Sequence, residues 1–191
     1  MATSIEIYGY HGTTTESAKR IIKQGFAQSR QGYDWLGDGI YFWQDAPERA
    51  WEWAKNLSKR RGEKPAVVGV KIRFNIGQQE GNTQYVDLLD IPWEKRIGST
   101  FRRLKRDFEL QGLALPKQTT GAHRLDYQVV NSLVEDLDRE GIKVLAMRAA
   151  FQEGIPIFEE SALHNRSHVQ IAVRDEGIII EKWIERRRRR R

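Results

Sequence analysis

GYHGT at residues 9–13, followed by WLGDGIYF at residues 35–42, is the pair of segments that decides the fold. Isoleucines and tyrosines alternate before the first segment, which predicts a strand over residues 4–10. The second segment opens an apolar strand at Ile40. A short amphipathic helix that ends at Gly25 separates the two strands. We therefore expect both segments to present side chains and glycine backbone to one pocket.

The rest of the chain alternates predicted helices and strands, which favours the α+β class. Asp45 is expected to cap the first of these helices, because its carboxylate accepts from backbone N–H groups and Pro47 suits the first turn. The 191 residues are enough for one domain with a sizeable core, over residues 1–185. The predicted helices span 45–62, 93–112 and 125–140, and the predicted strands span 66–74, 84–89, 143–149, 167–174 and 177–183.

The net charge of +6 comes from one place, the six consecutive arginines at residues 186–191. Without them the 32 cationic residues fall to 26, which equals the number of acidic residues. A terminal run of like charge is typical of a solvated tail or an artificial appendage. A nucleic-acid-binding arm is the alternative interpretation. A second basic cluster, at residues 96–106, is either a solvated helix face or a contact for phosphates or an acidic protein.

Composition excludes several classes of protein. The absence of cysteine excludes a disulfide framework, a thiolate zinc site and a cysteine nucleophile. No apolar run approaches the ~18 residues that a spanning helix needs, and the first residues do not follow a signal-peptide pattern. These features predict a cytoplasmic protein that does not partner a membrane.

The two glycine-containing segments resemble motifs of ADP-ribosyltransferases of the diphtheria-toxin and poly(ADP-ribose) polymerase type, the His-Tyr-Glu group. The first family motif reads Tyr-His-Gly-Thr, as at residues 10–13, and the second reads Gly-x-Gly-Ile-Tyr-Phe, as at residues 37–42. The resemblance implies split antiparallel β-sheets around an NAD cleft, with flanking helices. It covers residues 8–58, 66–74 and 144–181, and makes residues 90–140 or so a variable helical insertion.

The resemblance also implies roles for individual residues. His11 would hydrogen-bond the ribose of NAD, and the backbone of Gly12 would bind the nicotinamide amide. Tyr41 would stack on the nicotinamide ring, which needs an aromatic surface. Thr13 and Gly39 would complete the NAD-binding segments.

The family places a second aromatic residue on the helix that follows the tyrosine strand. Trp51 and Trp53 are the candidates here, and the spacing alone does not decide between them. Each is also expected as a large core residue when it is considered singly.

The third family motif places a glutamate on a late strand, and this chain has Gln170 in that position. An amide can orient a ribose hydroxyl but carries no negative charge, and losing such a charge costs about 10²–10³ in rate. Three interpretations follow: another carboxylate acts, the substitution inactivates a toxic protein, or the chain binds NAD without turnover. Alternation along the strand places His168 on the same face as Gln170.

Other ionisable residues near these motifs are candidates for metal binding or for the missing negative charge. His164 and His168 have a zinc-binding spacing only on a helix, so we expect no metal site at this strand entry. The carboxylates nearest the motifs in sequence are candidates to compensate for Gln170: Asp34, Asp38, Glu159 and Glu160.

The sequence therefore predicts a mono-ADP-ribosyltransferase that moves ADP-ribose from NAD to a protein, RNA or DNA acceptor and releases nicotinamide. Its catalytic residues would be His11, Tyr41 and Gln170, with NAD as substrate and no metal. The family suggests a bacterial toxin or defence effector, with an antitoxin or immunity protein as partner. The alternatives are a catalytically silent NAD- or ADP-ribose-binding sensor and a nucleic-acid-binding protein.

Overall fold

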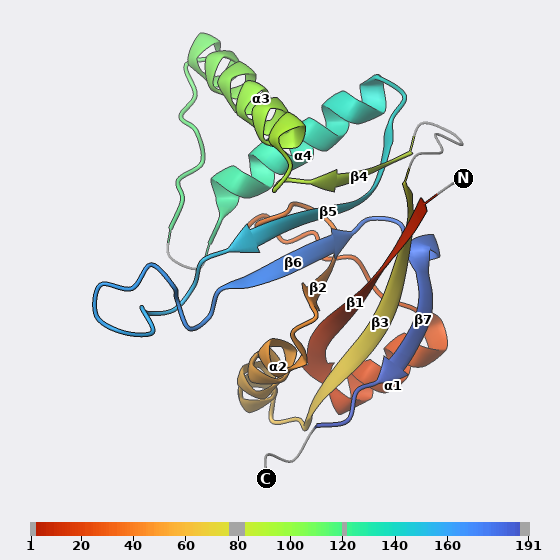
Figure 1. Ribbon diagram of the computed structural model, residues 1–191. Coiled ribbons are helices and arrows are strands. Elements are labelled where there is room, and N and C mark those ends of the chain that lie inside the picture. Colours follow the sequence, from red (N-terminus) through yellow and green to blue (C-terminus); the bar gives the residue numbers. More distant parts are fainter. Residues whose placement is uncertain (1–2, 77–82, 120–121, 188–191) are drawn as a thin grey trace.

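The computed structural model describes residues 3–76, 83–119 and 122–187, and within them seven strands form one sheet (Figure 1). The order across the sheet is β4-β5-β6-β2-β1-β3-β7. The strands are β1 (Thr3–Thr14), β2 (Ile40–Gln44), β3 (Pro65–Ile76), β4 (Thr83–Asp87), β5 (Lys143–Phe151), β6 (His168–Val173) and β7 (Ile179–Ile184). The helices are α1 (Thr15–Gln24), α2 (Pro47–Arg61), α3 (Ile91–Leu110) and α4 (Arg124–Arg139), with a 3₁₀ turn at Glu176–Ile178.

The predicted α+β class is confirmed, but the expected pair of antiparallel sheets is one mixed sheet. β4 runs parallel to β5, and α3 and α4 lie between them in the chain. Parallel neighbours need such a long crossover, which the helices supply. β2 meets β1 through only two residue pairs, Gly9 with Gln44 and Tyr10 with Trp43. Beyond this short contact the two halves of the sheet diverge (Figure 1).

Two apolar clusters build most of the core. Around Phe42 and Val70, side chains of β1, β2, β3 and β6 pack with α1. Around Leu133 and Met147, α4 packs on β4 and β5. The helices of the predicted insertion are therefore integrated into the body. Ala146 of β5 packs in the cluster with α1 and its neighbour Met147 packs in the cluster with α4, so the two helices cover opposite faces of the sheet. No helix in the described ranges has the length and apolar character needed to cross a bilayer.

The predicted cap of α2 is wrong. Ala46 occupies the cap position without a side-chain hydrogen bond, while Asp45 adopts a left-handed φ of 50°. The Asp45 N–H still donates to the Tyr8 carbonyl of β1 at 2.9 Å. Sheet pairing thus extends one residue past β2 and holds Asp45 in a geometry that cannot cap the helix.

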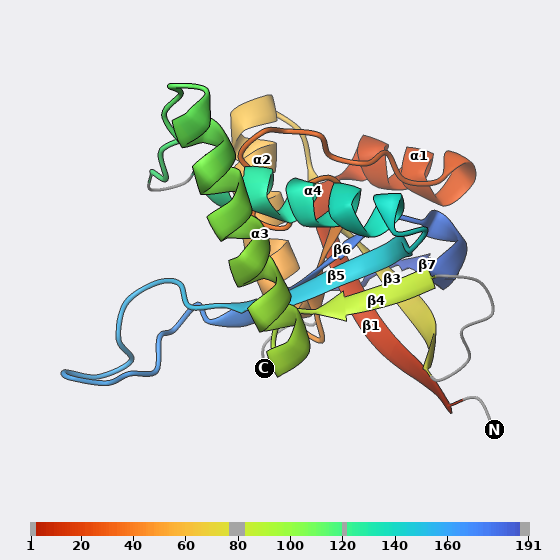
Figure 2. The same ribbon diagram turned by 90° about the horizontal axis from the view of Figure 1, so that it is seen from above.

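Residues 152–167, between β5 and β6, form an arm that projects from the sheet (Figures 1 and 2). Its two sides are joined by backbone bonds from Ile157 N–H to the Leu163 carbonyl and from Asn165 N–H to the Ile155 carbonyl, both 3.0 Å long. The arm is therefore an ordered extension whose base lies beside the end of β6.

Gly12 sets how closely α2 packs on β1. A Cβ atom there would lie 2.3 Å from the Ala50 carbonyl oxygen, and Gly12 faces Ala50 and Ala54 of α2. Overpacking of this kind typically costs 1–3 kcal/mol.

We therefore expect Gly12→Ala to lower the free energy of unfolding by about 2 kcal/mol in urea denaturation. Gly32→Ala is the control, because its nearest heavy atom would be 4.0 Å away; an equal loss in both variants would contradict the packing argument.

Candidate functional site

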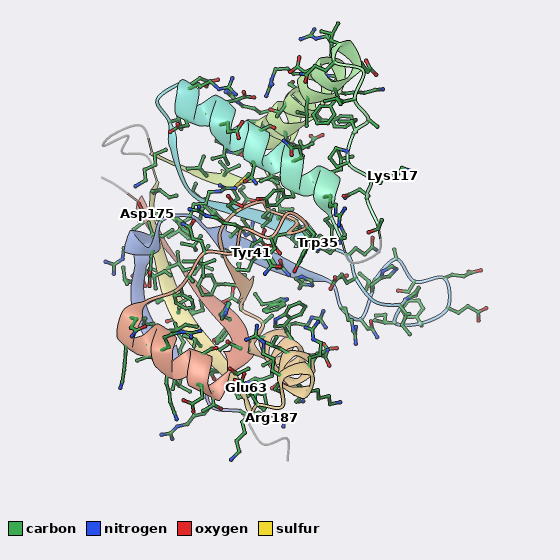
Figure 3. All side chains as sticks on the ribbon, turned by 180° about the vertical axis from the view of Figure 1, so that it is seen from behind. Trp35, Tyr41, Glu63, Lys117, Asp175 and Arg187 are labelled. Carbon is green, nitrogen blue, oxygen red and sulfur yellow. The ribbon has the colours of Figure 1, made fainter. Side chains whose placement is uncertain are left out.

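A cavity of about 410 Å³ opens where β1 and β2 separate. Its size is within the range of small-molecule sites. Trp35 and Tyr41 lie between α4 and α2 in the view of Figure 3. The lining combines four aromatic residues, three carboxylates and two arginines with smaller groups: Trp35, Tyr41, Trp43, Trp53, Asp34, Glu52, Glu153, Arg49, Arg166, His11, Gly12, Ala27, Ser29, Gly39, Ile40, Asn56 and Gln170.

The strand register explains why the cavity exposes backbone. The Tyr8 carbonyl accepts from Asp45 on the β2 side of β1. Hydrogen bonding in antiparallel pairs changes side at each residue, so Gly12, four residues later, directs its N–H and C=O to that same side. Pairing with β2 has ended by then. The Gly12 amide therefore faces the cavity instead of a strand.

His11 occupies the position where the ladder would continue. Its Nδ1 lies 2.9 Å from the Tyr41 carbonyl, which the register places opposite Gly12. A carbonyl only accepts, so Nδ1 carries the proton. Burial lowers the pKa of His11, which keeps the ring neutral. Nε2 is thus left as a hydrogen-bond acceptor.

Tyr41 offers its ring rather than its hydroxyl. The hydroxyl donates to the Gly37 carbonyl at 2.7 Å and accepts from the Leu36 N–H at 2.9 Å. Burial also raises the pKa of Tyr41 well above its usual value, so the phenol stays protonated. The two backbone bonds fix the aromatic face against the loop that precedes β2.

Helix α4 braces this loop from outside. The Asn131 amide oxygen accepts from Asp38 N–H at 3.1 Å and from Arg174 Nη2 at 2.8 Å. The Asp38 carboxylate accepts from the Tyr127 hydroxyl at 2.7 Å. Asp38 is therefore engaged in holding the loop and does not line the cavity.

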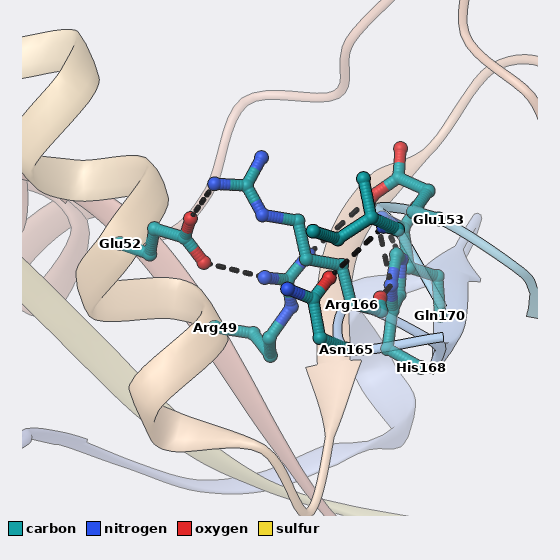
Figure 4. A network of polar contacts seen from close by, with 8 residues as sticks. Arg49, Glu52, Glu153, Asn165, Arg166, His168 and Gln170 are labelled. Atoms are coloured by element: carbon teal, nitrogen blue, oxygen red, sulfur yellow. Dashed lines mark hydrogen bonds and ion pairs between the residues drawn. The ribbon is translucent and has the colours of Figure 1, made fainter. Parts of the chain in front are cut away.

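Gln170 and His168 form a hydrogen-bonded pair on β6 (Figure 4). His168 Nδ1 lies 2.8 Å from the Arg166 carbonyl, so Nδ1 donates and Nε2 is the acceptor in the neutral ring. Gln170 Nε2 accordingly donates to His168 Nε2 at 2.9 Å. No hydrogen bond of the Gln170 amide oxygen is found among the described residues, so this oxygen is the atom that Gln170 offers to the cavity.

Several predicted site residues lie away from the cavity. Thr13 is 5% exposed within β1, and the His168 side chain, at 2% exposed, stands behind Gln170. Glu159 and Glu160 lie on the projecting arm. His11, Gly12, Gly39, Tyr41 and Gln170 are the predicted residues that the fold brings together, along with Trp53 and Asp34.

The faces of α2 distinguish its two tryptophans. Trp51 is 8% exposed and packs with Ala50 and Ala54, whereas Trp53 is 48% exposed and lines the cavity. Arg49, Glu52 and Asn56 share the face of Trp53, at helical spacings of three and four residues. The spacing of these polar residues is a sequence signal for this face of α2, and the aromatic residues alone do not indicate it.

Ion pairs connect α2 to the base of the arm across the cavity mouth (Figure 4). Glu52 pairs with its helix neighbour Arg49 and, at 2.5 Å, with Arg166. Arg49 also reaches Glu153 at 3.4 Å. Glu153 and Arg166 lie close to the two ends of the arm. No sequence pattern places them at the cavity, because only the pairing of β5 with β6 brings them there.

Two buried donors of the lining lack partners. Trp43 Nε1 and Arg49 Nε make no hydrogen bond among the described residues. Both atoms are covered by neighbouring protein atoms, so they are unsatisfied polar groups in the wall of the cavity. No group of three or more His, Asp or Glu in the described part of the chain is arranged to hold a metal ion.

Comparison with known proteins gives no relative. No family model matches the chain, and no curated protein or solved structure matches it. The geometry of the cavity is therefore the basis for assigning a function.

The lowered pKa of His11 predicts a pH-dependent stability. The unfolded state binds a proton below pH ~6.5 while the folded state does not, so folding loses up to about 1.4 kcal/mol per pH unit as pH falls. In His11→Asn the amide nitrogen still reaches the Tyr41 carbonyl but does not titrate. We expect the wild type to lose about 1 kcal/mol more than this variant between pH 7.5 and 5.5 in urea denaturation. Equal losses would show that His11 is protonated in the fold.

Proposed function

We propose that this chain is a mono-ADP-ribosyltransferase that moves ADP-ribose from NAD to a macromolecular acceptor and releases nicotinamide. The observation that carries the proposal is a cavity with four aromatic residues, three carboxylates and an open glycine amide. The nicotinamide of NAD is a flat aromatic cation that bears a carboxamide. Aromatic faces and carboxylates both attract such a cation.

The backbone suits the carboxamide of nicotinamide. Gly12 directs both its N–H and its C=O into the cavity, and a carboxamide has one acceptor and one donor group to pair with them. Tyr41 and Trp53 supply the aromatic surfaces. Glycine is favoured at position 12 for two reasons, since α2 also leaves no room for a side chain there.

Two acceptors suit the ribose next to nicotinamide. His11 Nε2 carries no proton because Nδ1 holds it, and the Gln170 amide oxygen is an acceptor by its own chemistry. Each is therefore able to accept from a ribose hydroxyl.

The reaction would begin with the bond between ribose C1′ and the nicotinamide nitrogen. As it breaks, its electron pair neutralises the pyridinium, and nicotinamide leaves. The ribose becomes oxocarbenium-like until the acceptor nucleophile bonds to C1′ and loses its proton. The residues described here would hold the ring and sugar and shield them from water. Gln170 carries no charge to activate a sugar hydroxyl, which favours single transfer over polymer formation.

A catalytically silent NAD-binding sensor is the second candidate, and the uncharged Gln170 favours it. The nucleic-acid-binding alternative has less support, because three of the five cations in residues 96–106 are ion-paired. Arg96 pairs with Glu140, Arg103 with Asp107 and Asp136, and Lys105 with Glu109. The arginine tail lies outside the described residues beyond Arg187. The proposed enzyme would act in the cytoplasm as a toxin or a defence effector.

Incubation with labelled NAD and cell lysate tests the proposal. We expect label from the ADP-ribose part to enter macromolecules, and separate protease, RNase and DNase digestion to identify the acceptor class. NAD binding without label transfer or nicotinamide release would favour the sensor. The absence of NAD binding in calorimetry would contradict both.

Replacement of Trp53 tests the aromatic lining. Loss of its stacking on a cationic ring removes about 1–2 kcal/mol, so Trp53→Ala should weaken NAD binding roughly tenfold in calorimetry. Tyr8→Ala is the matched control, because Tyr8 is also a half-exposed aromatic but lies outside the cavity. Equal affinity of the two variants would remove Trp53 from the NAD site.

A further inference from the structure

We propose that Glu153 is the catalytic carboxylate of this site, which takes the proton of the acceptor nucleophile and supplies the negative charge that Gln170 lacks. The inference rests on the proposed function. It assigns a role to a residue that no motif in the sequence indicates, since Glu153 lies just after β5 at the start of the arm.

The chemistry calls for a carboxylate near the sugar. Positive charge develops on the ribose as nicotinamide leaves, and the attacking nucleophile must lose a proton. A fixed negative charge stabilises the first event and a general base serves the second. Gln170 does neither, because its amide carries no charge and its nitrogen is bonded to His168.

Three carboxylates line the cavity, and two of them are engaged elsewhere. Asp34 accepts from the Ser29 hydroxyl at 2.5 Å, and burial raises its pKa. Glu52 is bound through both oxygens, by Arg49 at Oε2 and by Arg166 at Oε1. Burial thus favours the neutral form of Asp34, and Glu52 has no oxygen to offer without losing an ion pair.

Glu153 differs from Glu52, because its contacts involve one oxygen only, and it is less enclosed than Asp34, with a side chain that is 38% exposed. Its Oε2 lies 3.4 Å from Arg49 Nη2 and 3.8 Å from His168 Nδ1. No contact of Oε1 is found among the described residues. The second oxygen therefore remains available to a substrate.

The strand pairing places Glu153 on the side of Gln170. β5 lies beside β6, with Ala149 opposite Gln170 and Phe151 opposite His168. His168 therefore stands between the two residues and contacts both (Figure 4). A sugar whose hydroxyl binds Gln170 would have Glu153 next to it, at the mouth through which an acceptor enters.

The proposed step balances in protons and electrons. The C1′–nitrogen bond breaks and its electron pair leaves with neutral nicotinamide. The nucleophile donates a pair to C1′, and its proton passes to the free oxygen of Glu153 and then to water. The net products are the ADP-ribosylated acceptor, nicotinamide and one proton.

The experiment compares Glu153→Gln and Glu153→Ala with Glu159→Gln, a matched carboxylate on the same arm outside the cavity. We expect both Glu153 variants to bind NAD within about threefold of the wild type and to lose 10²–10³-fold in the rate of nicotinamide release and transfer. Glu159→Gln should keep both properties. Added formate should restore part of the rate in Glu153→Ala, which a purely structural residue would not allow.

The outcomes separate this inference from the proposed function. A wild type that binds no NAD overturns both. A wild type that transfers ADP-ribose while Glu153→Gln does so within threefold overturns the role of Glu153 alone. So does a parallel loss of NAD affinity, or a loss of rate that formate does not restore. Melting temperatures near that of the wild type exclude misfolding, because glutamine still accepts from Arg49.

Gln170→Glu gives an independent test. A glutamate cannot donate to His168 Nε2 and would add a second negative charge near Glu153. We therefore expect nicotinamide release to stay level or to fall. A tenfold or greater gain in the rate of nicotinamide release would show that the site needs its negative charge at position 170. That result would contradict the assignment to Glu153.

Discussion

The hydrogen bond from His11 to the Tyr41 carbonyl is the contact on which the site depends. Two strands that could have continued to pair are held apart by an imidazole, and the backbone of the next residue turns outward as a result. The bond requires a proton on the nitrogen that faces the carbonyl, and the neutral ring that burial favours leaves the other nitrogen as an acceptor. The His11 side chain thereby ends the pairing of β1 with β2, leaves the Gly12 amide exposed and presents its Nε2 as an acceptor.

The surrounding elements keep this opening in place. Tyr41 is tied to the preceding loop, and α4 holds that loop through Asn131. Helix α2 lies directly on Gly12, with no space for a Cβ atom between them. The floor of the cavity is thus built from short, buried contacts, whereas ion pairs between α2 and the arm border its mouth.

The sequence predicted the elements better than it predicted their surroundings. Alternation and glycine placement gave the strands of His11, Tyr41 and Gln170 because those signals are local. Asp45 failed as a cap because a bond from another strand holds it, which no local pattern reveals. The choice between Trp51 and Trp53 depended on which face of α2 meets β1. Glu153 could not be found at all, because only the pairing of β5 with β6 brings it to the cavity.

The contrast between floor and mouth has a consequence for how the molecule responds to its medium. The residues of the mouth are partly exposed, with Arg166 and Glu52 at 53% and 38%, so dissolved ions weaken their attraction over a Debye length of about 8 Å at physiological ionic strength. The buried bond of His11 is shielded from this screening. Ionic strength therefore weakens the ion pairs that border the mouth more than the buried bond that shapes the floor, so the two parts of the cavity respond differently to dissolved ions.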